Sequence, residues 1–212
     1  MNPYLKERYN SEIREKLQKQ FGFKSPMEVP TLKKIVVNVG IGKEVEKDKG
    51  TKDTVYEEIK QITGQAPVVT KAKIAISNFK IRQNDPVGVK VTLRGDKMWD
   101  FAAKLIDIVF PQIKDFRGFT TKAFDGQGNY TVGLEDQTIF FEIDPNRVAK
   151  LRGMEITFVT SAKNDEEGKE LLVAFGFPYR ETVKKKIEKK ANKSDKKTSK
   201  GKEKSKSKKK AK

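Results

Sequence analysis

Two pairs of carboxylates are the first residues whose types and spacing could support chemistry. Glu135 is followed directly by Asp136, and one residue separates Glu142 from Asp144. Clustered carboxylate oxygens suit Mg²⁺, and two nearby carboxyl groups can act as acid and base in a hydrolysis. The sequence around them offers no nucleophile, no base of suitable pKa and no phosphate-binding loop, and solvated acids are common on protein surfaces. We therefore expect no catalytic residue, no metal site and no cofactor, and a Mg²⁺-dependent nuclease using Glu142 and Asp144 is the enzyme alternative.

The chain contains neither histidine nor cysteine among its 212 residues. It thus lacks the commonest general base, a thiol nucleophile, thiolate metal sites and disulfides. A glycine turn, Val39-Gly40-Ile41-Gly42, resembles half of a dinucleotide-binding fingerprint, but the third glycine is missing because position 45 is valine. Charged residues occupy the N-terminal segment where a signal peptide needs an apolar stretch, and no apolar run approaches membrane-spanning length. The composition favours a cytoplasmic, non-enzymatic protein with no membrane partner.

A basic segment at residues 68–94 holds six basic residues against a single acid, Asp85. Basic and apolar residues are interleaved in it, and Phe79 is available to stack on a base. A solvated surface hairpin is the alternative interpretation of residues 71–82. Strand periodicity places four further groups on one exposed face, where hydrogen-bonding groups are mixed with positive charge: Asn38, Lys90, Thr92 and Arg94. Such a face suits binding to the riboses and phosphates of RNA.

Periodic apolar positions predict the helices and strands that must position these groups. Four amphipathic helices are expected: one with its apolar stripe at residues 5–17 and its end at Gly22, one with a capping box of Thr54 and Glu57 and its end at Gly64, one from a cap at Asp96 to Pro111, and one from Asn164 to Gly176. Strands are expected at residues 34–39, 66–76, 87–94, 130–134, 138–143 and 154–160. The alternation within them predicts an α+β fold, a mainly antiparallel sheet with helices packed on one face and the other face open to RNA.

Most of the net charge of +17 lies outside this pattern. Residues 184–212 contain 16 lysines against three acids, which leaves only four of the net positive charges for residues 1–183. Ordering this segment would bury almost nothing apolar, since Ile187 is its only large apolar side chain. We predict a globular RNA-binding domain over residues 1–183 and a disordered lysine-rich tail over residues 184–212. A free RNA chaperone that binds through the tail by counterion release is the alternative to a folded RNA-binding face.

Residues from about 2 to 180 resemble the bacterial large-subunit ribosomal protein L-five family, whose members bind 5S rRNA. The matching stretches follow one another along the chain: Met27-Glu28-Val29-Pro30, Val37-Asn38-Val39-Gly40-Ile41-Gly42, Ile62-Thr63-Gly64-Gln65-Ala66-Pro67, Lys80-Ile81-Arg82-Gln83, Lys90-Val91-Thr92-Leu93-Arg94-Gly95, Asp115-Phe116-Arg117-Gly118, Ala123-Phe124-Asp125-Gly126, Gly128-Asn129-Tyr130 and Arg152-Gly153-Met154. The resemblance implies a structural component of the translation machinery in the central protuberance of the large ribosomal subunit. The partners it implies are 5S rRNA, 23S rRNA, P-site tRNA, a small-subunit head protein and other central-protuberance proteins.

Three sets of site residues follow from the resemblance. The residues implied in 5S rRNA binding are Asn38, Gln65, Lys90, Thr92 and Arg94. A hairpin implied to reach the elbow of P-site tRNA carries Lys71, Lys73, Asn78, Phe79, Lys80 and Arg82. The long loop at residues 111–130 is implied to form an intersubunit bridge with the small-subunit head protein, through Arg117, Lys122 and Gln127.

The chain departs from the family pattern in the hairpin and in the bridge loop. Asn78 and Asn84 stand where the family usually has glycine, and asparagine tolerates the left-handed backbone angles that such turns need. Asp85 beside them is expected to repel a phosphate. Gln127 replaces a usual arginine and Phe141 a usual proline, and the lysine-rich tail has no counterpart in the typical member.

Overall fold

The computed structural model describes residues 4–42, 50–148 and 150–180. The chain divides into two units, Met1–Pro178 and Tyr179–Lys212, and only Tyr179 and Arg180 of the second unit are described. The lysine-rich tail predicted for residues 184–212, and the domain boundary predicted before it, lie outside the described residues. All described helices and strands belong to the first unit.

Five strands form one antiparallel sheet in the order β2-β3-β1-β5-β4. The strands are β1 (Leu32–Gly40), β2 (Val68–Lys71), β3 (Pro86–Leu93), β4 (Tyr130–Leu134) and β5 (Met154–Thr160). Together with the helices they give the expected α+β fold. The central strand β1 is flanked by β3 and β5, so residues from three separate segments of the sequence come together across its two edges.

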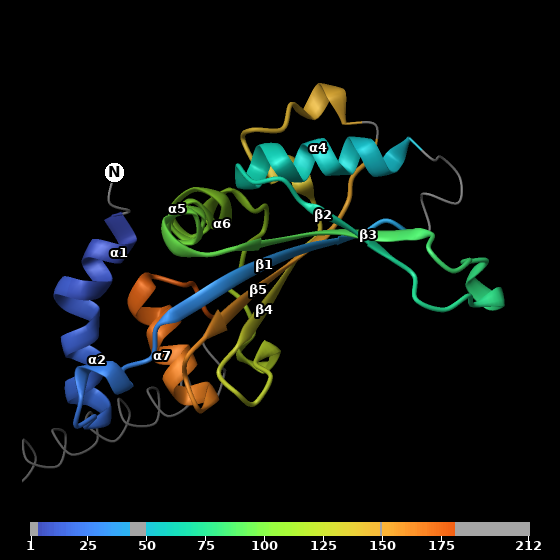
Figure 1. The fold of residues 1–212 in the computed structure, drawn as a ribbon. Helices are drawn as coiled ribbons and strands as arrows, with labels where there is room; N and C mark the ends of the chain where they lie inside the picture. The colour runs from blue at the N-terminus through green and yellow to red at the C-terminus, as the bar shows by residue number, and fades with distance from the viewer. Residues whose placement is uncertain (1–3, 43–49, 149, 181–212) are drawn as a thin grey trace, which may run out of the picture. The chain divides into compact units, whose positions relative to one another are not determined.

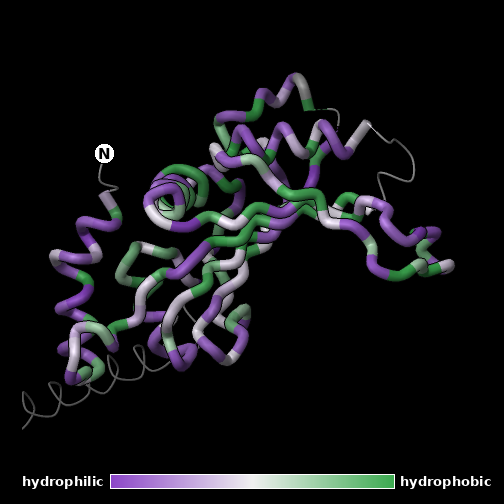
Figure 2. The backbone as a smooth tube through the Cα atoms, viewed as in Figure 1, coloured by the Kyte–Doolittle hydropathy of each residue, from purple (hydrophilic) through white to green (hydrophobic). Residues whose placement is uncertain are grey.

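One face of the sheet is buried and the other is open. In β1, Ile35, Val37 and Val39 are at most 3% exposed, whereas Val36 and Asn38 between them are half-buried. β3, β4 and β5 repeat this pattern of burial. Figure 1 shows α4, α5 and α6 along one side of the strands, and Figure 2 shows hydrophobic and hydrophilic residues succeeding one another along them. Because side chains of a strand alternate between its faces, the apolar residues meet the helices and the polar residues face outward.

The first predicted helix is confirmed as one continuous helical segment. It consists of α1 (Tyr4–Arg8), a π-helical turn (Tyr9–Ile13) and α2 (Arg14–Phe21). Its apolar stripe is buried, and Gly22 ends the segment with a left-handed φ of 69°. The last predicted helix is confirmed as α7 (Asp165–Phe175), which ends at Gly176 with a φ of 97°. Glycine at these ends is expected because it adopts left-handed angles without strain.

The starts of the two middle helices were predicted wrongly. α4 (Thr51–Thr63) begins after Gly50, three residues before the predicted capping box, and Glu57 pairs with Lys60 at 3.1 Å instead of closing that box. α5 (Gly95–Lys104) begins after Arg94, so Asp96 lies inside its first turn, where its carboxylate pairs with Lys6 at 2.7 Å. In both cases a charged partner competes for the side chain that local reasoning assigned to the backbone.

The third helical segment also continues past the proline that was expected to interrupt it. A π-helical turn (Leu105–Val109) follows α5 and leads into α6 (Phe110–Gln112). Pro111 stands directly after the π-helical turn, and the segment ends one residue later at Gln112, before the extended Ile113.

The strand predicted at residues 138–143 is absent, and turns replace it. The carboxylate of Asp136 accepts hydrogen bonds from the backbone N–H of Thr138 (2.7 Å) and from its hydroxyl (2.8 Å). This local bond starts a 3-10 turn at Gln137–Ile139. A side-chain acceptor at the start of the segment therefore outweighs the β propensity of its apolar residues.

Candidate nucleic-acid interface

The open face of the sheet brings together residues of β1 and β3 that were predicted to bind RNA. Asn38 and Lys90 are direct register partners, and Thr92 lies opposite Val36 in the neighbouring row. Partners in an antiparallel pair project to the same face, so their side chains are neighbours. Lys90 is exposed, whereas Asn38 and Thr92 are half-buried within the face. The amide and hydroxyl groups therefore lie at the level of the sheet, with the lysine above them.

Gln65 reaches this face from the loop between α4 and β2. Its side-chain amide donates to the backbone oxygen of Thr92 at 3.1 Å, which holds the two residues together. The hydroxyl of Thr63 donates to the Gln65 backbone oxygen at 3.2 Å and so steadies the loop from the helix end. The sequence interpretation named Gln65 by resemblance alone; the hydrogen bond shows that its side chain lies beside Thr92.

Gly88 is buried beside Asn38, where β3 lies between β1 and β2. A Cβ added at Gly88 would lie 2.9 Å from the Thr70 hydroxyl and 3.0 Å from the backbone oxygen of Val39. A larger residue there would displace the Thr70 side chain and press on the Val39 carbonyl, so glycine lets these groups approach closely.

Sequence reasoning missed two charged residues on the open face. Glu155 pairs in register with Asn38 from β5, and Lys34 of β1 lies opposite Val159. Alternation along residues 34–39 places Lys34 on this face, since it shares the parity of Asn38, but Lys34 was not included among the predicted binding residues. Nothing local could have placed Glu155 beside Asn38, because strand pairing is a long-range property.

The predicted tRNA-contacting hairpin continues from β2 and β3 as an ordered structure. Ala72 and the Asn84–Asp85 pair exchange backbone hydrogen bonds of 2.8 and 2.9 Å, and Ile76 and Ile81 exchange two more at the tip. Phe79 is 64% exposed, as stacking on a base requires. The tip apolar residues Ile74 and Ile76 are 74% and 47% exposed, so they do not form a buried backing for the basic side chains.

The expected left-handed residues of the hairpin are confirmed in one case and wrong in the other. Asn84 has a φ of 70°, whereas Asn78 lies inside a 3-10 turn and Lys80 takes the left-handed position with a φ of 53°. Asp85 has a structural role, because its carboxylate accepts from the backbone N–H of Arg82 at 2.7 Å. Side-chain acceptors of this kind stabilise turns. The Asp85 carboxylate thus stabilises the turn at residues 82–85.

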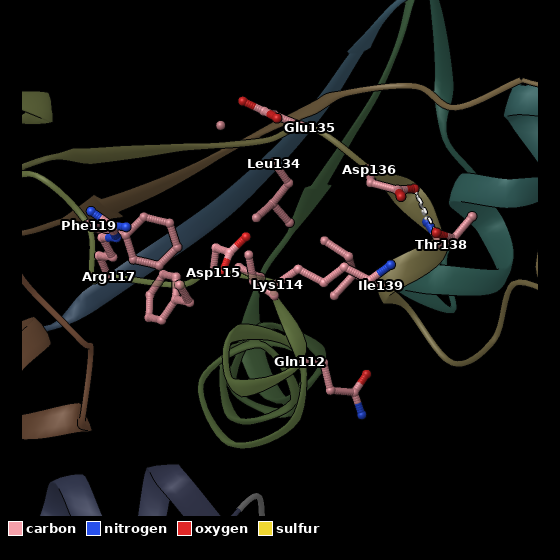
Figure 3. A pocket seen from close by; sticks show the side chains of 14 residues that line it. Gln112, Lys114, Asp115, Arg117, Phe119, Leu134, Glu135, Asp136, Thr138 and Ile139 are labelled. Atoms are coloured by element: carbon pink, nitrogen blue, oxygen red, sulfur yellow. Dashed lines mark hydrogen bonds between the residues drawn. The ribbon is translucent and has the colours of Figure 1, made fainter.

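The three predicted bridge residues are not brought together. Arg117 lines a pocket of about 570 Å³ between residues 112–119 and 133–139, shown in Figure 3. Lys122 stands in a separate 3-10 turn (Thr121–Ala123), and Gln127 borders a different hollow at the end of the open face. The loop packs against the core through Phe119, whose ring centroid lies 4.8 Å from that of Phe110 and 5.1 Å from that of Phe177.

Three of the four carboxylates that could have supported chemistry have structural partners. Glu142 pairs with Lys104 in a half-buried contact, Asp136 caps a turn, and Asp144 accepts from the backbone N–H of Asn146 at 3.0 Å. Among the described residues no group of three or more potential metal ligands is found. No helix in the described part of the chain is long and apolar enough to cross a membrane.

Both halves of the open face match models of one protein family. Residues 25–82 match the model described as ribosomal protein L5, and residues 86–179 match the model described as ribosomal L5P family C-terminus. The first match contains β1, α4, β2 and most of the hairpin. The second contains β3, β4, β5 and the helices between and after them. The cluster of Asn38, Gln65 and Thr92 therefore spans both matches.

Proposed function

The chain belongs to the ribosomal protein L5 family, a family of structural proteins of the large ribosomal subunit, and on that premise we propose that its open face binds 5S rRNA. The observation that carries the proposal is the cluster of Asn38, Gln65 and Thr92 on one exposed face, with Lys90 in register with Asn38. Family membership supports association with ribosomal RNA. The cluster indicates which surface makes the contact.

The arrangement divides the work of binding between two kinds of group. Asn38 and Thr92 each carry a donor and an acceptor close to the plane of the sheet, where a ribose hydroxyl or base edge can meet them. Lys90 and Arg94 are exposed and, within the described ranges, their side chains make no ion pair or hydrogen bond. Their charge is therefore available to phosphates, which releases counterions and makes affinity fall with salt.

The hairpin and the bridge loop have proposed partners of their own. Exposed Phe79 and the basic residues Lys71, Lys73 and Arg82 support contact with the elbow of P-site tRNA, and Lys80 and Asn78 lie at the tip beside them. Arg117 and Lys122 on the exposed side of the loop at residues 111–130 support contact with a small-subunit head protein. 23S rRNA and other central-protuberance proteins complete the proposed surroundings.

A gel-shift titration of the full chain against 5S rRNA at several salt concentrations tests the proposal. Thr92→Ala and Asn38→Ala should each weaken binding about tenfold, the effect of one lost hydrogen bond to a polar partner, with little change in the salt slope. Lys71→Ala is the matched control, since it lies on the hairpin and should scarcely change 5S rRNA affinity. Equal losses from all three changes, or no binding by the unaltered chain at low salt, contradict the proposed surface.

The lysine-rich segment supports a second candidate, a free RNA chaperone. Sixteen lysines within residues 184–212 would give strong binding that ignores sequence. Comparing the full chain with a chain ending at residue 183 separates the two functions. Retained preference for 5S rRNA over an unrelated RNA supports the folded face, and loss of that preference supports the chaperone.

A further inference from the structure

A hollow of about 690 Å³ lies at one end of the open face, away from Gly88 and Gly40. It is lined by the beginning of β1, the residue after β3, the end of β5 and the loop before β4. These segments contribute four basic side chains, Lys33, Lys34, Arg94 and Lys163, and two amides, Gln127 and Asn129. Four basic side chains therefore line one shallow hollow of this face.

The strand register explains why these residues meet. Lys34 lies opposite Val159 in the β1–β5 pair, and Ile35 lies opposite Leu93, so Arg94 follows next to Lys34 on the other edge of β1. Both basic residues have the same parity as Asn38 and Thr92 and project to the open face. Lys163 follows β5 three residues after Thr160 and closes the same end of the hollow.

The lining of the hollow holds basic side chains and no acidic residue. Two carboxylates beside it are bound to backbone N–H groups: Glu167 accepts from Lys163 at 3.0 Å, and Asp125 accepts from Gln127 and Asn129. In the part of the chain that the structure describes, the side chains of Lys34, Arg94 and Lys163 make no ion pair and no hydrogen bond, unlike Lys60 and Lys104, which pair with carboxylates. Like charges held together repel one another, so such a group is most stable with an anion between its members.

The wall that carries Gln127 is rigidly built. The Asp125 carboxylate accepts from the backbone N–H groups of Gln127 and Asn129 (2.9 and 3.1 Å) and from the Asn129 amide (2.7 Å), and these bonds lower the pKa of Asp125. Gly128 is fastened from both sides: its N–H donates to Asp165 at 3.0 Å, and its oxygen accepts from the Thr160 hydroxyl at 2.8 Å. The loop therefore holds Gln127 at the hollow without help from a ligand.

We propose that this hollow binds a backbone phosphate of RNA, which makes Lys34, Lys163 and Gln127 part of the RNA interface. Four residues of extended strand, or about 13 Å, separate Lys34 from Asn38, so the phosphate belongs to a different nucleotide from the one at Asn38. The hollow thus anchors the strand at a second point and fixes its direction across the sheet. The proposal rests on the proposed binding of 5S rRNA and assigns Gln127 to that interface instead of the intersubunit bridge.

The test is the salt dependence of 5S rRNA binding by the full chain with the paired change Lys34→Gln and Lys163→Gln. Loss of one phosphate contact should lower the salt slope by about 1 and weaken binding about tenfold near physiological salt. The arginine versions, Lys34→Arg and Lys163→Arg, keep the charge and should bind like the unaltered chain. Lys114→Gln is the matched control, because it removes an exposed lysine at the pocket of Figure 3 instead.

A variant that adds one positive charge at the hollow should have the opposite effect on affinity and on the salt slope. Gln127→Arg should strengthen 5S rRNA binding and raise the salt slope by about 1. The phosphate site is contradicted if the salt slope is unchanged both in the paired lysine variant and in Gln127→Arg. If Thr92→Ala still weakens binding in that case, the proposed function stands. Absence of binding by the unaltered chain overturns both. Equal losses from Lys114→Gln and the paired variant also overturn the hollow, since they would show only an effect of total charge.

Discussion

Replacing Gly168 in α7 with alanine should destabilise the protein, although helix propensity predicts stabilisation. In an exposed helix, replacing glycine with alanine stabilises by about 1 kcal/mol. Gly168, however, is buried against the loop at Gly128. A Cβ added there would lie 2.5 Å from the Gly128 oxygen and 2.9 Å from its Cα.

The atoms that would be struck belong to the backbone, so no side chain can rotate away. Overpacking of this kind typically costs about 1 to 3 kcal/mol, and here the Gly128 segment is also held by hydrogen bonds to Thr160 and Asp165. Because a backbone atom 2.5 Å away cannot rotate aside, we expect the upper part of that range, about 2 to 3 kcal/mol. Subtracting the propensity gain of about 1 kcal/mol, we expect Gly168→Ala to lower the free energy of unfolding by about 1 to 2 kcal/mol. The displaced loop carries Gln127, so 5S rRNA affinity should fall with it.

Urea denaturation of the full chain, followed by circular dichroism, measures this change. Gly133→Ala is the control: Gly133 lies in β4 with nothing within 4 Å of an added Cβ, so alanine there should be neutral or slightly stabilising. A Gly168→Ala protein as stable as the original, or more stable, would refute the close helix–loop contact. A loss of similar size in Gly133→Ala would remove the contact as its explanation.

Two further predictions concern single groups. Burial raises the pKa of Tyr130 to about 12. Because this folded pKa lies above the ordinary value of 10.0, the contribution of Tyr130 to stability is complete below pH 10 and should be lost as pH rises toward 12. Denaturation at pH 9 and at pH 11 measures the loss, and Tyr130→Phe should lack the part that Tyr130 contributes. Asp85→Ala removes the acceptor for the Arg82 N–H and should speed hydrogen exchange at that amide about fivefold, whereas Asp85→Asn keeps an acceptor and should change it less; equal exchange in both variants would contradict the structural role of Asp85.

Local patterns predicted most of the elements and failed where a distant or competing partner intervened. The alternation at residues 34–39 and 87–94 predicted β1 and β3, because a half-buried strand must alternate. The capping box at Thr54 and the strand at residues 138–143 were wrong. Glu57 and Asp136 bind other partners there, and single-sequence periodicity does not register such competition.

The candidate interface was predicted in part for the same reason. Parity along each strand is sufficient to place Asn38, Lys90 and Thr92 on exposed faces. It could not show that Gln65 donates to the Thr92 oxygen, since 27 residues separate them. The family resemblance grouped Gln127 with Arg117 in one bridge loop, although they line different hollows.

By itself, the sequence determined which residues of each strand face outward, where the helices end in glycine, and that the folded part carries little net charge. These properties depend on neighbours within a few residues. Only the tertiary structure decided that Lys34, Arg94 and Lys163 converge on one recess and that Glu155 stands beside Asn38. Strand order and register follow from the packing of the whole buried face, and one step of register would send every side chain of a strand to the opposite side.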